Sequence, residues 1–370
     1  MTTATNPLRI AVVGAGLIGR EHVALIREHP QTTLAAIADV SADGRTLAQA
    51  NGVPFHEDYV RMLDVERIDG VVVALPNQLH LSSGLQCIER RLPMLMEKPL
   101  ADTLPAALEL MRAVEASGVP MLVGHHRRHS PDMSAARDAI ANGELGELVA
   151  VSGLWWMHKN ERYFDATWRR SAGGGPLLIN LIHDVDCLRM LCGEIDDVQA
   201  MVSSRARGFE VEDTAAVILR FANGAIGTFS LSDAVPSPWN WESSSGQALY
   251  FPPQREDAYF IGGRKASLSV PGLAKWQHLS SDGRWQDPLV RHQVRVEIVG
   301  AYRRQLDNLV GVIRGTAAPT VSARDGFMTL ATVLAIRRAG ETGRVVRVAD
   351  LVAEAEASLR DRGGSSRTRT

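Results

Sequence analysis

The chain has 370 residues, and at roughly 150 residues per domain this length predicts two or three domains and excludes a single small module. Its 40 lysines and arginines nearly balance 42 aspartates and glutamates, so no strong global charge attracts nucleic acid or an anionic membrane surface. Three cysteines are too few for a disulfide framework, and we find neither a signal peptide nor an apolar run of the roughly 18 residues that a membrane-spanning helix needs. These features predict a cytoplasmic protein whose partner is a small molecule, with no membrane or nucleic-acid partner.

Short apolar runs alternate with helical patterns in the first third of the chain, as in βαβ units around a parallel sheet. We expect one helix over residues 17–27 and another that starts near Asp102 or Thr103, with Pro105 early in it and Gly118 just beyond its end. The predicted strands are residues 8–13, 33–38, 53–55, 71–75, 94–96 and 121–123. The pattern predicts an α/β domain over residues 1–124.

After Gly124 the pattern changes to longer strands with hairpin signals, which predicts a second, α+β domain over residues 125–348. Asn223-Gly224 suits the positive φ angles of a tight hairpin turn, and Gly262-Gly263 has a similar place between two runs. We expect a large, mostly antiparallel sheet with a helix over residues 177–191 on one face. The strands expected are residues 148–155, 198–203, 214–221, 225–231, 259–261 and 266–270; a loop over 234–257, helices over 294–315 and 323–338 and a disordered tail over 355–370 complete the prediction.

A glycine-rich turn joins the first predicted strand to the first predicted helix. Gly14 permits a tight turn, Gly16 lets a pyrophosphate approach the backbone, and Gly19 allows close packing of the helix. The helix N-terminus, at Leu17 and Ile18, offers N–H groups to phosphates. In this context the spacing predicts a Rossmann-type dinucleotide site.

Asp39 ends the second predicted strand, twenty residues after the last glycine of the turn. A carboxylate at this place accepts hydrogen bonds from the ribose hydroxyls and repels a 2′-phosphate, which favours NAD over NADP. Arg45 and Ser41 are close in sequence, so NADP stays open as an alternative.

Two polar motifs follow buried strands at the sheet edge where open α/β folds bind ligands. They are Pro76-Asn77 after the fourth strand and Glu97-Lys98-Pro99 after the fifth. A lysine here can hold a substrate hydroxyl, and its charge stabilises the alkoxide that develops as hydride leaves, so Lys98 is the first catalytic candidate. The alternative is a surface lysine paired with Glu97.

Together these features resemble the family of glucose-fructose oxidoreductase and inositol 2-dehydrogenase, from Leu8 to about Val348. Further matching pieces are His80, Gly124 with Arg127-Arg128, Trp168-Arg169, Gly173-Gly174-Gly175 and His183-Asp184-Val185-Asp186. The resemblance implies a Rossmann domain that binds a nicotinamide dinucleotide and a second domain whose sheet forms homodimers or homotetramers. It places these residues near the cofactor: Pro76, Asn77, His80, Glu97, Lys98, Trp168 and Arg169.

The same resemblance implies that His183 is the general base that works beside Lys98. An imidazole titrates near neutrality, so it can take the hydroxyl proton during oxidation and return it during reduction. The alternative is a histidine buried between helix and sheet.

The chain departs from this family four residues before the histidine, where inositol dehydrogenase-like members carry an aspartate and this chain has Ile179. Asn180 follows, but one residue along an α-helix turns the side chain by about 100 degrees, so Asn180 does not simply replace the carboxylate. We expect Asn180 to contact the substrate from a neighbouring direction. The departure puts the polyol specificity of the inositol enzymes in doubt.

A basic run, His125-His126-Arg127-Arg128-His129, follows the sixth predicted strand, and Arg169-Arg170 adds to it. One interpretation is a cationic cleft mouth in which His126 and Arg127 bind a carboxylate or phosphate of the substrate. The other is a structural cluster that pins a hinge. Adjacent side chains on an extended segment point in opposite directions, so we expect no metal site. Among the aromatic residues we expect Tyr163 near the substrate and most others in the core.

The sequence therefore predicts an NAD(P)-dependent dehydrogenase that moves hydride between a secondary alcohol of a cyclic polyol, sugar derivative or hydroxylated ring acid and nicotinamide. Lys98 and His183 would handle the proton. The alternatives are a redox-neutral hydrolase or lyase with tightly bound NAD, a dihydrodiol dehydrogenase of an aromatic acid, and a non-catalytic dinucleotide sensor. A sensor has no need for both Lys98 and His183, which favours an enzyme.

Overall fold

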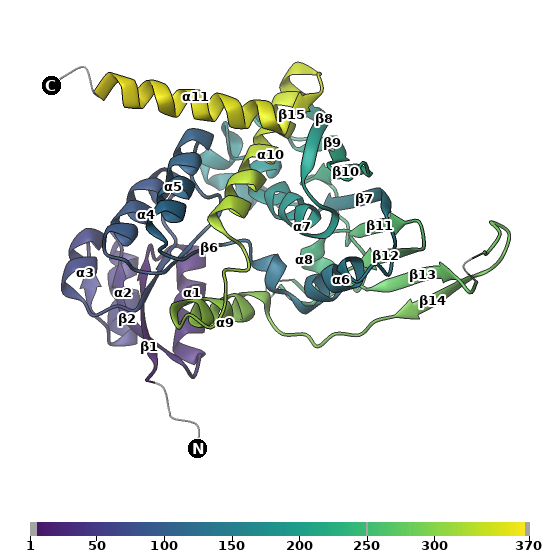
Figure 1. Cartoon of the computed structure of the whole chain (residues 1–370). Helices are drawn as coiled ribbons and strands as arrows, with labels where there is room; N and C mark the ends of the chain where they lie inside the picture. The colour runs from purple at the N-terminus through teal and green to yellow at the C-terminus, as the bar shows by residue number, and fades with distance from the viewer. Residues whose placement is uncertain (1–5, 249–250, 281, 367–370) are drawn as a thin grey trace. The chain divides into compact units, whose positions relative to one another are not determined.

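The computed structural model describes residues 6–248, 251–280 and 282–366, and the chain forms two compact units (Figure 1). The first unit contains the chain up to His126, Tyr302–Leu330 and the segment from Glu354; the second contains Arg127–Ala301 and Ala331–Ala353. The sequence analysis assigns each domain one continuous stretch, whereas the chain returns to the first unit twice. Within the described ranges, no helix is both long and apolar enough to cross a membrane.

The first unit is built on a six-stranded parallel sheet in the order β3-β2-β1-β4-β5-β6. Its direction of growth reverses between β1 and β4, and ligands of open α/β sheets bind beyond the carboxyl ends of the strands at such a point. The predicted α/β class is confirmed. The strands are β1 (Leu8–Val13), β2 (Thr32–Ala38), β3 (Phe55–His56), β4 (Gly70–Val73), β5 (Met94–Met96) and β6 (Met121–Val123).

The strand predicted at residues 53–55 begins two residues later because the preceding helix ends there. Gly52 is in the left-handed conformation, and the N–H of Val53 donates to the carbonyl of Ala48 at 3.2 Å, so Val53 closes the helix and does not pair with β2.

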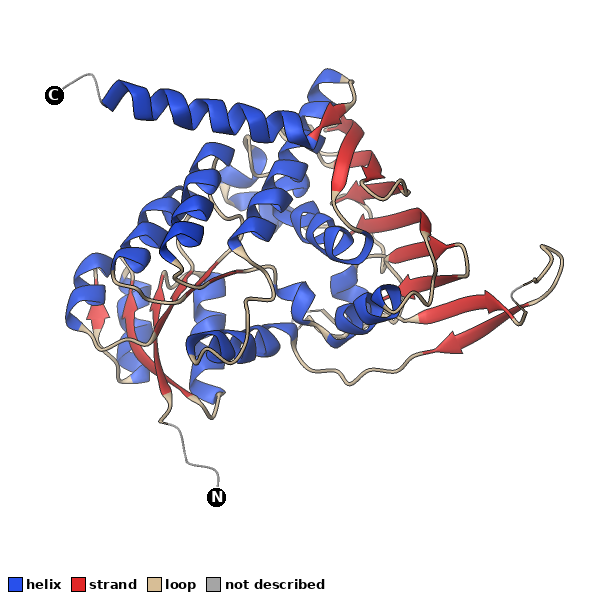
Figure 2. Cartoon of the chain, in the orientation of Figure 1, coloured by secondary structure: helices blue, strands red, loops and turns tan. Residues whose placement is uncertain are grey.

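Helices lie on both faces of this sheet (Figure 2). The helix expected near Thr103 begins as predicted, because the Thr103 hydroxyl accepts from the N–H of Ala106 and Pro105 is in the first turn, and it ends at Gly118, which has a φ of 69°. One apolar core joins Ile26 with Leu309, which comes from a helix far along the chain. The helices are α1 (Leu17–Glu28), α2 (Ala42–Asn51), α3 (Tyr59–Val65), α4 (His80–Glu89), α5 (Leu104–Ser117) and α9 (Ala301–Ile313), with a 3₁₀ turn η1 (Asn77–Leu79). The helix predicted over 294–315 is therefore seven residues shorter at its start.

The second unit is built on a nine-stranded sheet in the order β14-β13-β12-β11-β7-β10-β9-β8-β15. Of its strand pairs, β7 and β10 run parallel and the others antiparallel, which confirms a large, mostly antiparallel sheet. The strands are β7 (Leu148–Trp156), β8 (Ile195–Ser203), β9 (Thr214–Phe221), β10 (Ile226–Ser232), β11 (Tyr259–Gly263), β12 (Ala266–Val270), β13 (Ala274–His278), β14 (Leu289–Gln293) and β15 (Val346–Arg347).

The sequence analysis missed β13, β14 and β15, because these strands are short and lack a clear apolar alternation. The Asn223-Gly224 turn between β9 and β10 is confirmed, and Gly224 has a φ of 90°. The turn predicted at Gly262-Gly263 is not found there, because both glycines belong to the end of β11. A Cβ on Gly263 would overlap the carbonyl of Leu145, so the glycine is needed for a close approach of two chain segments.

Helices cover one face of this sheet and leave the other face open (Figure 2). The helix predicted over 177–191 instead starts with a π-helical turn, Leu177–Leu181, and the predicted loop over 234–257 contains a short helix whose first N–H groups are capped by Asn240. The disordered tail predicted from residue 355 is helical up to Ser366, because Leu351 and Ala355 are buried and anchor it; residues 367–370 lie outside the described chain. The helices are α6 (Pro131–Ala141), α7 (Ile182–Cys192), α8 (Trp241–Ser245), α10 (Ala323–Thr342) and α11 (Val348–Ser366), with 3₁₀ turns η2 (His126–His129), η3 (Glu161–Asp165) and η4 (Thr167–Arg170) and the π turn η5 (Leu177–Leu181).

Candidate functional site

The glycine turn after β1 has room for a phosphate group. Gly14 has a φ of 94°, and a Cβ there would overlap the carbonyl oxygen of Ala74. A Cβ on Gly19 would overlap the carbonyl of Gly14, so the glycine lets α1 pack closely on the turn. Gly16 is exposed, and the place of its missing Cβ is open space. The backbone at the start of α1 is therefore accessible to a pyrophosphate, and these residues fit a dinucleotide.

Asp39 is attached to the same turn. Its Oδ2 accepts from the N–H of Ala15 at 2.6 Å, and its Oδ1 accepts from the N–H of Ser41 at 2.7 Å. Burial opposes ionisation, but the hydrogen bonds from Ser41 and Ala15 and the charge of Arg20 together lower the pKa of Asp39. A carboxylate offers about four acceptor positions. Asp39 is therefore ionised at neutral pH and keeps capacity for ribose hydroxyls.

The two residues that left NADP open are bound elsewhere. The guanidinium of Arg45 pairs with Glu57 at 2.6 Å and lies over the Phe55 ring. The hydroxyl of Ser41 accepts from the N–H of Gly44 at 3.0 Å and caps α2. The contacts of Arg45 and Ser41 thus give no support for binding of the 2′-phosphate of NADP.

The loops after β4 and β5 are joined by His80. Pro76 and Asn77 are exposed at the carboxyl end of β4, whereas His80 has no exposed surface. Its Nδ1 lies 2.8 Å from the carbonyl of Pro99 and its Nε2 2.9 Å from that of Leu75, and burial lowers its pKa. His80 therefore holds two loops together, and its predicted contact with the cofactor stays a prediction.

Glu97 faces the interior of the first unit. Its Oε1 lies 2.9 Å from Nε2 of His22, and its Oε2 accepts from the backbone N–H of Lys98 at 3.3 Å. Its carboxyl group packs on Gly124, where a Cβ would meet it at 2.7 Å. Glu97 is therefore a mostly buried group beside Lys98, and its predicted contact with the cofactor stays a prediction. Lys98 itself is half-buried at the end of β5.

The sequence analysis missed His22 and Tyr302, which lie beside these residues. His22 is on the buried side of α1, 75 residues before its partner Glu97. The ring of Tyr302, in α9, stacks on His126 at 4.2 Å between centroids. His126 is buried under this ring, which gives it a packing role in place of the predicted substrate contact. Nothing in the spacing of the sequence points to either partner.

The basic run that continues into the second unit is a buried cluster and not an exposed cationic mouth. Arg127 and Arg128 are almost fully buried. Arg127 pairs with Asp184 at 2.7 Å and with Glu242, and Arg128 makes two bonds to Asp186 at 2.7 and 2.8 Å. These contacts favour the structural interpretation, so we withdraw Arg127 as a substrate ligand.

His183 is the second residue of α7, the helix that these ion pairs hold. It lies in the first turn of α7, is 8% exposed, and is followed directly by Asp184. Burial raises the pKa of Asp184 to about 6, against the attraction of Arg127, and the Tyr259 hydroxyl donates to Asp184 at 2.5 Å. The ion pair of Asp184 with Arg127 thus helps to position the adjacent His183 within the second unit.

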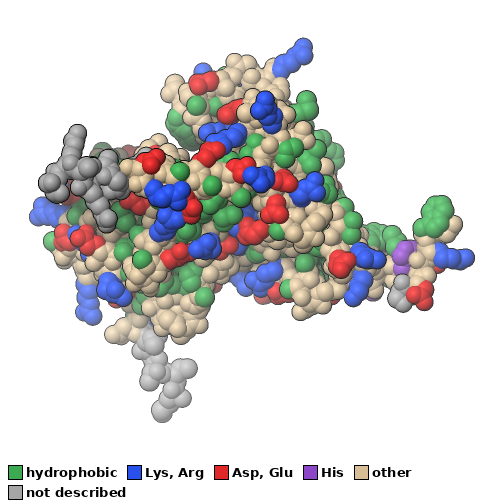
Figure 3. Space-filling model, turned by 45° about the horizontal axis from the view of Figure 1, so that its top comes forward, with side chains coloured by type: hydrophobic (Ala, Val, Ile, Leu, Met, Phe, Trp, Pro, Cys, Tyr) green, Lys and Arg blue, Asp and Glu red, His purple; other side chains and the backbone are tan. Residues whose placement is uncertain are grey.

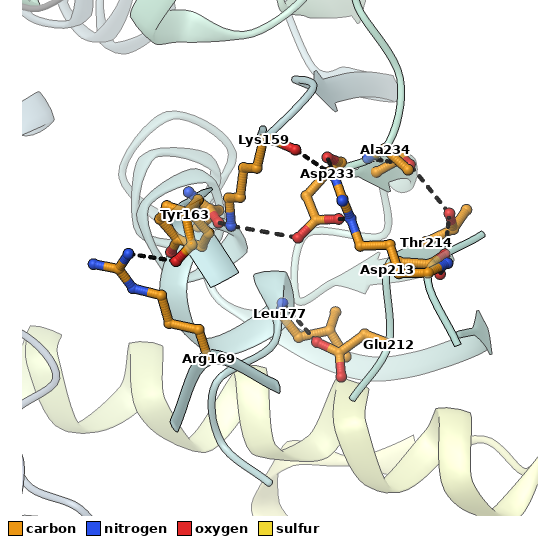
Figure 4. A network of polar contacts seen from close by, with 12 residues as sticks. Lys159, Tyr163, Arg169, Leu177, Glu212, Asp213, Thr214, Asp233 and Ala234 are labelled. Atoms are coloured by element: carbon orange, nitrogen blue, oxygen red, sulfur yellow. Dashed lines mark hydrogen bonds and ion pairs between the residues drawn. The ribbon is translucent and has the colours of Figure 1, made fainter. Parts of the chain in front are cut away.

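Tyr163, Arg169 and Asn180 are grouped around Lys159, which the sequence analysis missed; Figure 4 shows this lysine with Tyr163 and Arg169. The Arg169 guanidinium lies 4.0 Å from the centre of the Tyr163 ring and donates to the Tyr163 carbonyl at 2.6 Å. Nζ of Lys159 lies 4.6 Å from the centre of the same Tyr163 ring and donates to Oδ1 of Asn180 at 2.7 Å. Trp168 is 56% exposed in η4. The place of Lys159 just after β7 is the one signal that could have found it.

Two family models match the chain and together span most of it. The model described as "Oxidoreductase family, NAD-binding Rossmann fold" matches residues 8–125, and the "GFO/IDH/MocA C-terminal domain" model matches residues 133–269. The fold and the glycine turn thus define an oxidoreductase with an NAD-binding Rossmann domain. The chain belongs to the GFO/IDH/MocA family, as its motifs predict.

The relatives described here cover 70% to 92% of this chain. The rhizopine catabolism protein MocA of Rhizobium meliloti is 29% identical over 270 residues, which are 70% of this chain and 84% of that protein. The 1,5-anhydro-D-fructose reductase of Ensifer adhaerens is 28% identical over 356 residues, 92% of this chain and 98% of that one. The solved WlbA dehydrogenase from Bordetella pertussis, in complex with NADH and UDP-GlcNAcA, has a TM-score of 0.74 at 23% identity and covers 92% of this chain and 99% of that chain. That structure has the same fold.

We predict that Arg127→Met lowers the free energy of unfolding by about 3–5 kcal/mol, because it leaves the fully buried Asp184 carboxyl group without its cation and removes the partner of the partly buried Glu242. A carboxyl whose pKa is raised by folding binds protons more tightly in the folded state, so acid stabilises the variant. The loss measured by urea unfolding should therefore be smaller at pH 5 than at pH 8.

Arg137→Met is the control for this prediction, because Arg137 forms an exposed pair with Asp138, and we expect a change within about 0.5 kcal/mol. A loss below about 1 kcal/mol for Arg127→Met, or equal losses at both pH values, would contradict the buried-pair interpretation.

Proposed function

We propose that the protein is an NAD-dependent dehydrogenase that moves hydride between a secondary alcohol and nicotinamide, on a cyclic polyol, a sugar derivative or a hydroxylated ring acid. The observation that carries the proposal is the glycine turn with its open Gly16, bound through Ala15 to an ionised Asp39. The membership of the family and the names of its relatives, a reductase of an anhydro-sugar and a dehydrogenase solved with NADH and UDP-GlcNAcA, support the substrate class.

The contacts of Asp39 support NAD over NADP. The carboxylate is held in its charged form and would repel a 2′-phosphate. Arg45, the cation best placed in sequence to accept that phosphate, pairs with Glu57. We expect kcat/KM to be higher with NAD than with NADP.

Lys98 and His183 are the residues that we propose to handle the proton. NAD, held at Gly14 to Gly19 and Asp39, would supply the hydride acceptor. The ammonium of Lys98 would hold the substrate hydroxyl and stabilise negative charge on its oxygen as the carbon loses hydride. The imidazole of His183 would take the hydroxyl proton. Pro76, Asn77, Trp168 and Arg169 stay proposed cofactor contacts, and Tyr163 and Asn180 stay proposed substrate contacts.

The test is NADH formation at 340 nm on a panel of sugars, inositols, sugar acids and cyclic diol acids. Lys98→Met and His183→Gln should each lower kcat by at least about 10², because each removes a group of the proton transfer. His183→Gln should bind NADH as wild type does, since the cofactor residues of the first unit are untouched.

The matched controls are Lys265→Met and His292→Gln, which change exposed residues of the second unit and should keep full activity. Unchanged turnover in Lys98→Met and His183→Gln would refute their proposed roles. Consumption of a panel compound without net NADH would favour the redox-neutral alternative, and NAD binding with no turnover would favour a sensor.

We further propose that the protein is at least a homodimer, formed through the open face of the second unit's sheet. Side chains on this face alternate with buried ones and include exposed Met201, Ile218 and Phe260. A hollow on this face is lined by uncharged residues: Ser152, Gly153, Leu154, Gln199, Ala200, Met201, Ala216, Val217, Ile218, Thr228, Phe229 and Ser230. Lack of charge at the centre is typical of homodimer interfaces.

The rest of the surface is different in character. Figure 3 shows acidic and basic side chains interspersed on the face in view, with hydrophobic side chains toward the strands of the second unit and at the end of the β13–β14 hairpin. A second copy using the same open face would bury this apolar surface in a self-complementary contact.

We predict that Met201→Glu combined with Ile218→Glu converts the assembly to a smaller species, because four like charges would meet in a two-fold contact. Light scattering coupled to gel filtration measures the mass. Val65→Glu, an exposed apolar site in α3 of the first unit, is the control and should leave the mass unchanged. A wild-type monomer at micromolar concentration would contradict the proposal.

A further inference from the structure

Lys159 is a buried lysine that neither the family motifs nor the proposed proton transfer uses. It lies three residues after β7 and is 8% exposed. Its backbone N–H donates to the carbonyl of Asp233 at 2.9 Å, which continues the pairing of β7 with β10. Burial of an ammonium group is costly unless its charge and its donors are satisfied. The partners of this lysine therefore indicate what it is for.

The closest polar partner of the ammonium is a neutral amide and not a carboxylate. Nζ donates to Oδ1 of Asn180 at 2.7 Å and lies 3.5 Å from Oδ2 of Asp233. Asp233 is bound more tightly by Arg207, whose Nε donates to its Oδ1 at 2.7 Å. Figure 4 shows Lys159 directed toward this group of residues. Asp233 thus only partly balances the charge of Lys159, and the ammonium group makes its shorter hydrogen bond to the amide oxygen of Asn180.

This contact decides how Asn180 is oriented. An ammonium group only donates hydrogen bonds, so the atom that faces it must be the amide oxygen, and the amide nitrogen with its two N–H donors is on the other branch of the side chain. A donor at the oxygen also polarises the amide and strengthens its N–H groups. Asn180 is half-buried and precedes His183 by three residues on a continuous helix, so the two side chains leave neighbouring positions of one side.

Asn180 itself lies in the π-helical turn Leu177–Leu181. The expectation that Asn180 lies about 100 degrees from the position of Ile179 assumes α-helical geometry, whereas this segment is wound more widely. Such turns often occur at functional sites.

We propose that Lys159 is a positioning residue that fixes Asn180 as a hydrogen-bond donor toward the substrate beside His183. The inference rests on the proposed dehydrogenase function. A carboxylate at the place of Ile179 would accept a hydrogen bond from a substrate hydroxyl; the amide N–H groups instead select an acceptor oxygen, such as a ring ether, carbonyl or carboxylate oxygen, close to the carbon that reacts. Polyol hydroxyls can also accept from the amide, so within the proposed substrate class the contact favours a sugar or ring acid with such an oxygen over a plain polyol.

The charge state of Lys159 gives the proposal a signature in pH. The groups that face it are Asp233 at the end of β10, Arg207 between β8 and β9, and Tyr163 and Arg169 in η3 and η4. Burial lowers the pKa of Lys159 to about 8; Asp233 opposes this, and the positive charges of Arg207 and Arg169 add to it. Above about pH 8 the lysine becomes neutral and a weaker donor to Asn180, so KM should rise.

The test compares Lys159→Met, Asn180→Leu and the double variant on a substrate from the 340 nm panel. Each single variant should raise KM about tenfold with kcat within about threefold of wild type, because binding is lost and not the proton transfer. The double variant should be no worse than either single one, because Lys159 acts through Asn180. Additive losses of about a hundredfold, or unchanged KM in Lys159→Met, would overturn the proposal.

The variant Lys159→Arg keeps the test decisive if Lys159→Met does not fold. An arginine stays charged throughout, so the variant should lose the rise of KM between pH 7.5 and 9.5 that wild type shows. An identical rise in both would overturn the proposal. Lys275→Met, which removes a lysine paired with Glu144 at the sheet edge, is the matched control and should follow wild type.

Failure of the dehydrogenase proposal itself is recognised separately. If wild type turns over no panel compound, the comparison is made on the rise in Tm that panel compounds cause in protein saturated with NADH. A rise with acceptor-bearing acids or sugars that Lys159→Met loses and Lys159→Arg keeps would support the role of Lys159. No rise, or an equal rise in all variants, would overturn it.

Discussion

The buried ion pair between Arg127 and Asp184 is the interaction on which the second unit depends. Both side chains are almost fully buried, and Arg127 also binds Glu242 while Tyr259 donates to Asp184. Burying two charges costs several kcal/mol per ion, so such a pair adds little stability beyond a well-packed apolar contact, whereas loss of one partner is very costly. We infer that the pair serves geometry: it sets the rotation of α7. A second pair, between Arg128 and Asp186, fixes the same helix half a turn further on.

This arrangement holds the first turn of α7, which follows a π turn, in a defined position. His183, the proposed general base, precedes Asp184 directly, so the ion pair of Asp184 helps to set its position. In the first unit the main chain has the corresponding role. Asp39 binds a backbone N–H of the glycine turn, and His80 contacts carbonyls of the two strand-end loops, so these contacts tie the candidate cofactor edge together.

Features set by a few adjacent residues could be predicted from the sequence. Gly14 and Gly224 need positive φ angles that glycine adopts without strain, and Thr103 caps its own helix three residues on, so the turns and the helix start follow from local chemistry. The α/β alternation likewise determines the first sheet, because each buried strand is a short apolar run.

Features that depend on distant partners could not be predicted. Arg127 meets Asp184 57 residues on and Glu242 115 residues on, and an isolated basic run does not show whether its charges are paired or exposed. His126 is covered by Tyr302, which lies far along the chain where it returns to the first unit, and Lys159 meets Asn180 through strand and helix packing. The sequence analysis therefore finds the cofactor turn and the proposed catalytic pair but assigns substrate contacts to residues that the fold buries.

The most direct measurement follows the hydrogen itself. A substrate from the panel, deuterated at the carbon that bears the hydroxyl, is incubated with the enzyme and NAD, and the nicotinamide product is examined by mass spectrometry. The account predicts that NADH carries the deuterium and that turnover is slowed by an isotope effect. Substrate consumed with the deuterium returned to the product or lost to water, and none in NADH, would contradict net dehydrogenation.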